Sequence, residues 1–264
     1  MTVSTALADA VERLAIAADT GVPCAPVRDV IGADDVATAY RVQSALIARR
    51  LQRGATRVGR KIGLTSPAVQ AQLGVHQPDF GVLLDDMVVP DGGTVPLGRL
   101  LQPKVEGEIA FRLGADLTGD INGVTVRAAV ASAHAAIEIV DSRVAGWDIR
   151  IADTVADNAS SGMFVISEHA VGLDEFEPVS VEMTLEVNGT SASAGNGAAC
   201  LGDPLLALEW LARTAAQLDD PLRAGELVLS GALGPMVVVA PGDRVDVQIS
   251  GLGAVGVAFG NEEC

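Results

Sequence analysis

The first fifth of the chain carries hydrophobic positions at helical spacing. Leu7 and Val11 lie on one stripe of a helix predicted over residues 4–18, and a second helix is predicted between residues 34 and 54, where a glycine ends it. Two helices alone cannot bury both of their apolar faces. We therefore expect residues 1–55 to form a small helical part that packs on the rest of the chain.

From residue 56 onward the pattern changes to short apolar runs separated by Gly, Pro and Asp, which is typical of a β-rich body. Strict alternation over 179–187, followed by an Asn-Gly turn, predicts a hairpin over 179–195. The other predicted elements are strands at 57–64, 87–89, 104–112, 226–230, 235–240, 243–249 and 254–259, helices at 124–133, at 204–218 and beginning at Ser66-Pro67, and a loop over 76–81. We expect an α+β fold in which residues 56–264 form the catalytic domain and the last four strands close one antiparallel sheet or roll.

Two acidic residues lie two positions apart in the predicted strand 104–112. Because side chains alternate across a strand, Glu106 and Glu108 share one face and their apolar neighbours take the other. Two like charges in a partly buried place repel, and a hard cation such as Mg2+ relieves the repulsion. An edge strand with a solvated acidic face has the same pattern, so this spacing alone leaves both interpretations open.

A third acid, Glu138, lies in the middle of the small or branched apolar run 135–140. Such a run indicates a buried strand, in which a lone ionised glutamate is costly unless it is paired. Glu106, Glu108 and Glu138 together can form one side of an octahedral oxygen site, leaving the other positions for water or a chelating substrate. The three acids therefore predict a metal centre.

Composition excludes several classes of protein. The chain has 264 residues, 49% hydrophobic and 20% charged, and no run approaches the ~18 apolar residues that a membrane span needs. A net charge of −16 and 3% aromatic residues argue against binding to nucleic acid or to anionic membranes. The three cysteines are widely spaced and never form C-x-x-C, which argues against a disulfide framework and a zinc site. Without a secretion signal at the N-terminus, we expect a cytoplasmic protein.

Lysine is rare in this chain, because only Lys61 and Lys104 of the 18 basic residues are lysine. A lysine can shift its pKa and pass a proton, which an arginine cannot readily do. Elsewhere, the polar segment 157–162 leads into the apolar run 163–166. Its short side chains can hold a ligand, or they can form a helix end with ordinary turn chemistry.

Several ordered motifs resemble those of the fumarylacetoacetate hydrolase superfamily and, within it, the 2-keto-4-pentenoate hydratase group, also called 2-hydroxypenta-2,4-dienoate hydratases. The matching motifs are Gly-Arg-Lys-Ile-Gly-Leu-Thr at 59–65, Leu-Gly-Val-His-Gln-Pro-Asp-Phe-Gly at 73–81, Gln-Pro-Lys-Val-Glu-Gly-Glu-Ile-Ala at 102–110, Asp-Thr-Val-Ala-Asp-Asn-Ala-Ser at 153–160 and Gly-Ala-Leu-Gly-Pro-Met at 231–236. Two positions depart from the group: His76 stands where Asp is usual, and Gly107 where Ala is common.

This resemblance implies a mixed β-rich roll with a small helical N-terminal part. It implies Mg2+ or Mn2+ held by Glu106, Glu108 and Glu138, and a homo-oligomer. An association with neighbouring enzymes of the same pathway is a further hypothesis. The implied substrate is a small 2-oxo or dienol carboxylate from the meta-cleavage degradation of aromatic compounds. Protonation of the dienol at C5 and addition of water at C4 would give 4-hydroxy-2-oxopentanoate.

Three further residues receive roles in this interpretation. Lys61 and Asp79 form the predicted proton-handling pair, an ammonium near the enolate and a carboxylate that holds or deprotonates water. Ser160 is expected to hydrogen-bond the substrate carboxylate or the water. Each of the three also has a purely structural interpretation. Lys61 can be a strand lysine that reaches solvent, Asp79 a turn-forming aspartate after proline, and Ser160 a serine at a helix end.

Two other functions compete with hydration. A 2-oxo acid decarboxylase of the 4-oxalocrotonate type would use the same fold and metal site, since chelation of a 2-oxo acid stabilises either intermediate; the segment 232–236 resembles the hydratases and favours hydration. A non-catalytic subunit that braces a decarboxylase or an aldolase is the second. The intact acids count against it, because a purely structural subunit has no physical need for a charged cavity.

Overall fold

The computed structural model describes residues 3–66, 70 and 77–261. Its helices are α1 (Val3–Thr20), α2 (Arg28–Ile31), α3 (Val36–Gln52), α5 (Gly123–Ala129), α6 (Ile151–Ala156) and α7 (Pro204–Gln217). Its strands are β1 (Arg57–Gly63), β2 (Asp79–Leu84), β3 (Thr94–Val95), β4 (Lys104–Leu113), β5 (Val130–Val140), β6 (Ser161–Ile166), β7 (Glu182–Val187), β8 (Thr190–Asn196), β9 (Leu227–Leu229), β10 (Val237–Val238), β11 (Arg244–Ile249) and β12 (Gly253–Phe259). Within these residues, no helix has both the length and the apolar character to cross a membrane.

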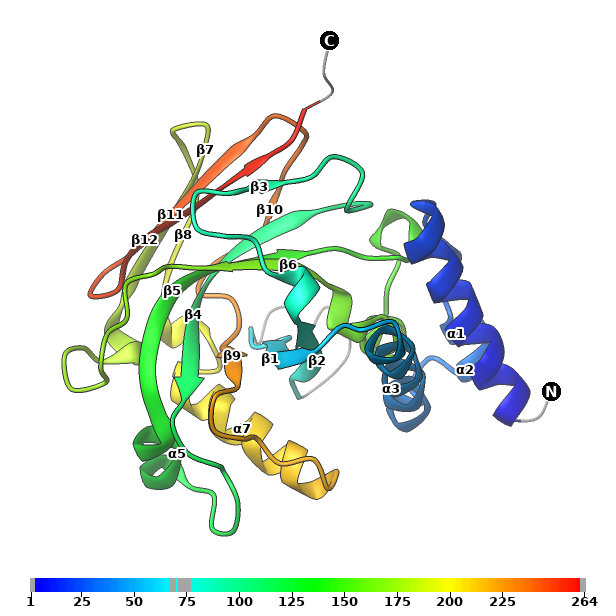
Figure 1. Ribbon diagram of the computed structural model, residues 1–264, viewed down its shortest axis with the longest axis horizontal. Coiled ribbons are helices and arrows are strands. Elements are labelled where there is room, and N and C mark those ends of the chain that lie inside the picture. Colours follow the sequence, from blue (N-terminus) through cyan, green and yellow to red (C-terminus); the bar gives the residue numbers. More distant parts are fainter. Residues whose placement is uncertain (1–2, 67–69, 71–76, 262–264) are drawn as a thin grey trace.

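The strands form two sheets. The seven-stranded sheet has the order β2-β1-β9-β4-β5-β6, with β10 paired to β4, and the five-stranded sheet has the order β3-β12-β11-β7-β8. Neighbouring strands are antiparallel except for the parallel pairs β1 with β9 and β3 with β12. The five-stranded sheet lies at one end of the molecule and helices α1 to α3 lie together at the other, with the long strands β4 and β5 between them (Figure 1).

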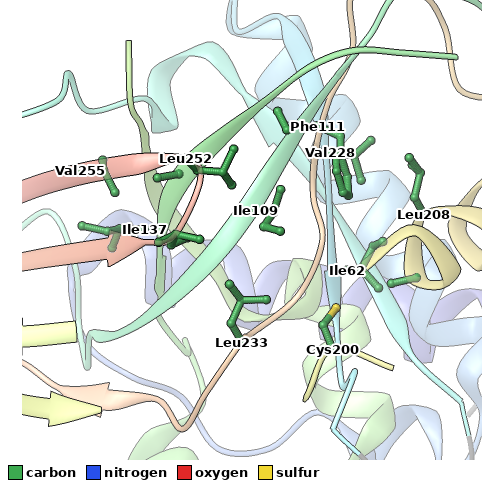
Figure 2. Close-up of a cluster of buried hydrophobic side chains, with 14 of the residues drawn as sticks. Ile62, Ile109, Phe111, Ile137, Cys200, Leu208, Val228, Leu233, Leu252 and Val255 are labelled. Atoms are coloured by element: carbon green, nitrogen blue, oxygen red, sulfur yellow. The ribbon is translucent and has the colours of Figure 1, made fainter. Parts of the chain in front are cut away.

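The main hydrophobic core lies on one face of the β4–β5 pair. Ile109 of β4 and Ile137 of β5 are fully buried there, together with Leu208 of α7 and Val255 of β12, so that this core joins both sheets and a helix (Figure 2). Side chains alternate across a strand, which sends the odd-numbered residues of β4 into this core. The even-numbered positions, which include both acids of that strand, therefore face the opposite side.

The N-terminal helices pack on α6 through a second core. Val11 and Leu14 of α1 and Val42 of α3 are buried against Val155 of α6. Gln43 of α3 is buried beside them, and its amide donates to the backbone oxygens of Phe80 (3.0 Å) and Val155 (2.9 Å). One side chain of the helical part thus ties β2 to α6. The division of the chain into 1–55 and 56–264 stays a prediction.

The structure confirms the α+β fold, the two N-terminal helices, the hairpin and the helix over 204–217. The strand predicted at 87–89 is wrong: Asp85–Met87 forms a 3-10 turn, and the strand lies at Asp79–Leu84, partly where a loop was expected. All six residues of β2 are buried, so the strand lacks the alternation that would have marked it. The helix predicted to begin at Ser66-Pro67 lies outside the described residues except for Ser66 and residue 70, and His76 lies outside them as well.

One predicted helix boundary and one predicted sheet arrangement fail because tertiary pairing overrides the local pattern. The helix expected over 124–133 ends at Ala129, because the alanine-rich residues that follow pair with β4 as the first part of β5. The last four strands do not close one sheet. β9 and β10 belong to the seven-stranded sheet and only β11 and β12 to the five-stranded one. Pairing between distant strands, as of β9 with β1, leaves no local mark in the sequence.

Candidate metal centre and active site

Three glutamates meet where β4 and β5 pair. The antiparallel register places Glu106 directly opposite Glu138, and Glu108 follows two positions along β4 on the same face. One carboxylate oxygen from each of the three lies within 4.8 Å of the others. The cluster thus follows from regular strand geometry.

The deeper part of this cluster contains carboxylate oxygens that lack hydrogen-bond partners. Glu108 and Glu138 are 0% and 1% exposed, and within the described part of the chain Glu108 Oε1 and Glu138 Oε2 accept no hydrogen bond. Glu108 Oε2 accepts the backbone N–H of Gly231 at 2.8 Å. Buried oxygens without partners are costly, and three carboxylates are donors that hard divalent cations prefer. The residues present therefore fit a divalent cation.

Crowding of the carboxylates changes their protonation. Burial, followed by the charge of Glu138, raises the pKa of Glu106 to about 7. Burial also raises the pKa of Glu108, with the charges of Glu138 and Glu106 adding to it, and burial raises the pKa of Glu138. A cation that binds here must displace protons, so its affinity is expected to increase with pH.

Lys61 joins the carboxylate cluster to a second group of polar residues. It lies on β1, is 3% exposed, and its Nζ is 3.1 Å from Glu138 Oε1. Burial alone lowers the pKa of Lys61, but the charges of Glu138 and Asp79 outweigh it and raise the pKa above its ordinary value. The ammonium is therefore charged at neutral pH.

Asp79 begins β2, next to Lys61 on the neighbouring strand. The register pairs it with Gly63 of β1, where an added Cβ would lie 2.3 Å from Asp79 Oδ1 and 3.3 Å from Lys61 Nζ. Glycine at this position makes room for the lysine–carboxylate pair. Burial raises the pKa of Asp79 to about 6, although the charge of Lys61 opposes the shift.

A chain of two hydroxyls leads away from Asp79. Thr154 Oγ1, on α6, donates to Asp79 Oδ2 at 3.5 Å, and Ser160 Oγ lies 3.2 Å from Thr154 Oγ1. Because the single hydrogen of Thr154 goes to the carboxylate, the hydroxyl of Ser160 donates to Thr154. All three side chains are buried. Ser160 is thus linked to Asp79 through one residue.

A left-handed turn places Ser160 in this chain. Asn158, Ala159 and Ser160 have φ of 56°, 52° and 52°, a conformation that residues other than glycine rarely adopt. The side chain of Asn158 offsets this strain by binding the backbone of Val82 on β2, accepting from its N–H (2.8 Å) and donating to its oxygen (2.9 Å). The turn is fastened to the strand that carries Asp79.

An arginine side chain hydrogen-bonds to the residues on both sides of the turn. The guanidinium of Arg143 donates to Asp157 Oδ1 (2.5 Å), to the Asp157 backbone oxygen (2.6 Å) and to the Ser161 backbone oxygen (2.9 Å). Burial raises the pKa of Asp157 to about 6 despite this arginine. Sequence reasoning gave no role to Arg143, Asn158 or Thr154. The signal for Thr154 and Asn158 was the motif at 153–160, part of a polar segment for which the sequence left both ligand binding and turn formation open.

A cavity of about 250 Å3 opens beside these groups. Lys61, Asp79, Glu106 and Ser160 line its polar side, while Glu108 and Glu138 lie buried behind it. Its other lining residues are Ile62, Gly63, Leu64, Thr65, Ser66, Lys104, Trp147, Ile149, Thr154, Ala159, Ala232 and Met236. The structure therefore brings all six predicted site residues together, in one place sized for a small molecule.

Comparison with known proteins identifies the family. The model of the fumarylacetoacetate (FAA) hydrolase C-terminal domain matches residues 51–258. The chain belongs to the fumarylacetoacetate hydrolase family, as its motifs predicted.

Individual relatives are similar over nearly the whole chain. The chain is 52% identical to the TodF product hydratase of Pseudomonas putida strain F1 over 96% of its own length and 95% of the relative's. It is 50% identical to the 2-keto-4-pentenoate hydratase of Paraburkholderia xenovorans strain LB400, over 95% and 94%. Among solved structures, the 4-oxalocrotonate decarboxylase of Pseudomonas putida G7, complexed with magnesium and adipate, superposes with a TM-score of 0.92 at 35% identity, covering 98% of each chain.

Proposed function

We propose that this protein is a divalent-metal-dependent hydro-lyase that adds water to 2-hydroxypenta-2,4-dienoate (2-keto-4-pentenoate), giving 4-hydroxy-2-oxopentanoate in the meta-cleavage degradation of aromatic compounds. Relatives that are 50% identical over 95% of the chain bear the name 2-keto-4-pentenoate hydratase. The observation that carries the proposal is a buried lysine, Lys61, which is paired with Glu138 of the carboxylate cluster and lies near the buried carboxyl group of Asp79.

Glu106, Glu108 and Glu138 would hold Mg2+ or Mn2+. Unpartnered buried oxygens on two of them support this, as does the magnesium in the similar decarboxylase structure. When bound, the ion supplies a Lewis acid that polarises the 2-oxo carboxylate.

The other residues handle charge and protons. The ammonium of Lys61 stabilises the negative charge that develops on the C2 oxygen when the substrate is an enolate. Asp79 holds the water and accepts its proton as the oxygen bonds to C4, and C3 takes up a proton in the same addition. A pKa of about 6 leaves Asp79 ionised at neutral pH and close enough to its working range to exchange protons. Ser160 positions the water or the substrate carboxylate.

The test is an assay of dienoate absorbance with the purified protein. Loss of absorbance with Mg2+ or Mn2+, abolished by a chelator and restored by added metal, is the expected result, with 4-hydroxy-2-oxopentanoate identified as product. Light scattering on the same sample measures whether the protein is the homo-oligomer that the family resemblance predicts. Metal-loaded protein that folds but leaves the dienoate unchanged would refute the proposal.

The decarboxylase is the second candidate, because a solved decarboxylase shares the whole fold at a TM-score of 0.92. The lower identity of that protein, 35% against about half for the hydratases, favours hydration. Release of CO2 from 2-oxohex-3-enedioate, without hydration of the dienoate, would reverse the choice. A non-catalytic subunit would instead show no turnover alone and raise the activity of a partner enzyme.

A further inference from the structure

The second lysine of the chain also lines the 250 Å3 cavity. Lys104 is outside the metal cluster and outside the Lys61–Asp79 pair, and its Nζ lies 4.2 Å from the centre of the Trp147 ring. We propose that Lys104, held in place by Trp147, is the residue that binds the carboxylate of the anionic substrate. This inference deepens the function proposed above and rests on it.

The backbone of Lys104 is fixed on both sides. It begins β4, where it pairs with Val140 of β5 and with Val238 of β10. Residues two apart on a strand share a face, so its side chain projects on the same side as Glu106. The ammonium therefore belongs to the same cavity as the carboxylate cluster.

The ring under the ammonium is fixed as well. Trp147 Nε1 donates to the backbone oxygen of Gln102 at 3.0 Å. The amide of Gln102 donates to the backbone oxygens of Ser142 (2.8 Å) and Val144 (2.9 Å), and its own oxygen accepts the N–H of Gly146 (2.7 Å). These hydrogen bonds connect Gln102 to several residues of the segment 142–147 and so fix the loop that carries Trp147. A cation over the face of a fixed indole is attracted to it, which orients Lys104 without neutralising it.

The net charge of the site favours a further positive group such as the ammonium of Lys104. Asp79 and the three glutamates bring four negative charges when ionised, against one positive charge on Lys61 and two on a divalent cation. The balance is already negative before an anionic substrate enters, and the enolate adds a further charge. Lys61 is already paired with Glu138. In the described part of the chain, Lys104 forms no ion pair, and the Trp147 ring is its neighbour.

The chemistry of the ligand matches this arrangement. A carboxylate has two oxygens. Lys104 can bind one of them, and the other stays free to bind a cation that the three glutamates would hold. A hydrogen bond from an ammonium to a carboxylate is among the stronger ones in proteins. Because the interaction is made with substrate and transition state alike, its loss is expected to act on KM more than on kcat.

The experiment compares Lys104→Met with Lys104→Arg, using 2-oxopentanoate as the probe in isothermal titration calorimetry with saturating Mg2+. We expect Lys104→Met to weaken binding of 2-oxopentanoate by about ten- to a hundredfold, the loss of one charged hydrogen bond. Lys104→Arg keeps the charge and should stay within about threefold of the parent. The methyl ester of the same acid lacks the carboxylate, so both variants should bind it as the parent does. In the dienoate assay, Lys104→Met should raise KM by a similar factor and change kcat much less.

Binding of Mn2+ to the ligand-free variants, followed by electron paramagnetic resonance, separates the inference from an effect on the metal centre. Unchanged Mn2+ affinity is expected. The inference is overturned if Lys104→Met binds 2-oxopentanoate as tightly as the parent, if acid and ester lose affinity equally, or if the parent does not bind the acid. Its failure is distinct from failure of the proposed function, because a parent protein that binds the acid but does not hydrate the dienoate would refute only the latter.

Discussion

The two halves of the site are built in different ways. The three glutamates lie on two neighbouring strands, β4 and β5, in a regular ladder where strand geometry alone brings them together. The proton-handling residues come from four separate segments: β1, β2, α6 and the left-handed turn at 158–160. The first half needs only correct pairing of two strands, whereas the second depends on the packing of most of the seven-stranded sheet against the helices.

The halves also differ in how their charges are compensated. The glutamate half has three buried oxygens with no hydrogen-bond partner in the described chain, of which one faces the ammonium of Lys61, and three pKa values raised by burial, so it is strained without a cation. In the other half, the charge of Lys61 and the hydroxyl of Thr154 lower the pKa of Asp79 and oppose part of the rise that burial causes. A bound metal should therefore stabilise the glutamate half. In the other half, substitutions of the residues that contact one another should lower activity or stability.

The largest expected effect follows from removing a ligand in the glutamate half. In Glu108→Gln the cation loses an anionic oxygen, and we expect kcat/KM to fall about a thousandfold, equivalent to roughly 4 kcal/mol of transition-state stabilisation. Without metal, this variant should be more thermally stable than the parent, because one of three crowded charges is gone. Added Mg2+ should raise the Tm of the parent but not that of the variant.

A matched control is Glu186→Gln, which removes the same charge from an exposed position on β7. It should retain both the activity and the metal-dependent rise in Tm. A Glu108→Gln variant that keeps the Mg2+ shift in differential scanning fluorimetry would show that the cation does not bind this cluster.

The next effect is on proton transfer in the other half. Asp79→Asn removes the carboxylate that accepts the proton of water, and a general base contributes about 10²–10⁴-fold to rate. In the parent, kcat/KM should fall as pH decreases through about 6, because protonation of Asp79 removes the base. A bound cation favours the ionised form and would shift this inflection to lower pH. The variant should lack the inflection in a pH–rate profile, and a variant with the parent's profile would exclude Asp79 as the base.

The contrast explains which part of the site could be predicted from sequence. The spacing of Glu106 and Glu108 and the apolar run around Glu138 encode their common face, because a strand has a fixed period of two. Lys61, Asp79 and Ser160 were found only through motifs that resemble a family, since nothing local shows that these segments meet. Thr154 and Asn158 were missed as individuals, because their roles depend on contacts with β2.

The fold shows the same limit. The two N-terminal helices, the helix over 204–217 and the hairpin were predicted correctly because periodicity, capping residues and an Asn-Gly turn are local signals. β2 was missed because it is buried along its whole length, and β9 was placed in the wrong sheet because it pairs with β1 and β4, both far away in sequence. Long-range pairing thus limits prediction of both the fold and the site.

Asp79 should also affect stability. Its native pKa of about 6 lies above the ordinary 3.8, so the native state binds the proton more tightly than the unfolded chain. The stabilisation from this group is full below about pH 3.8 and is lost as pH rises through about 6. In metal-free protein, Asp79→Asn should therefore gain stability relative to the parent between pH 4 and pH 7, by up to roughly 3 kcal/mol for a shift of about two pKa units. Urea unfolding at both pH values measures this, and a difference that does not change with pH would contradict it.

A smaller effect is expected at the turn that supports the proton-handling half. Asn158→Gly keeps the left-handed backbone at no steric cost but leaves the N–H and oxygen of Val82 without the Asn158 side chain, for a loss of about 2–3 kcal/mol in free energy of unfolding. Asn158→Ala has the same loss and should be about 1 kcal/mol less stable again, because alanine is strained at this φ. If alanine and glycine give equal stabilities in urea unfolding, strain at this position is not significant.

The smallest effect should come from the hydroxyls between the turn and Asp79. Ser160→Ala removes one neutral hydrogen bond and should lower kcat/KM about fivefold, near 1 kcal/mol. Thr154→Val removes the link from Ser160 to Asp79 at nearly constant volume. If Ser160 acts through that link, the double variant should lose little more than either single one, because each breaks the same chain. Additive losses in kcat/KM would instead mean that Ser160 acts directly on substrate or water. Ser160 and Thr154 would then contribute to the reaction independently of each other.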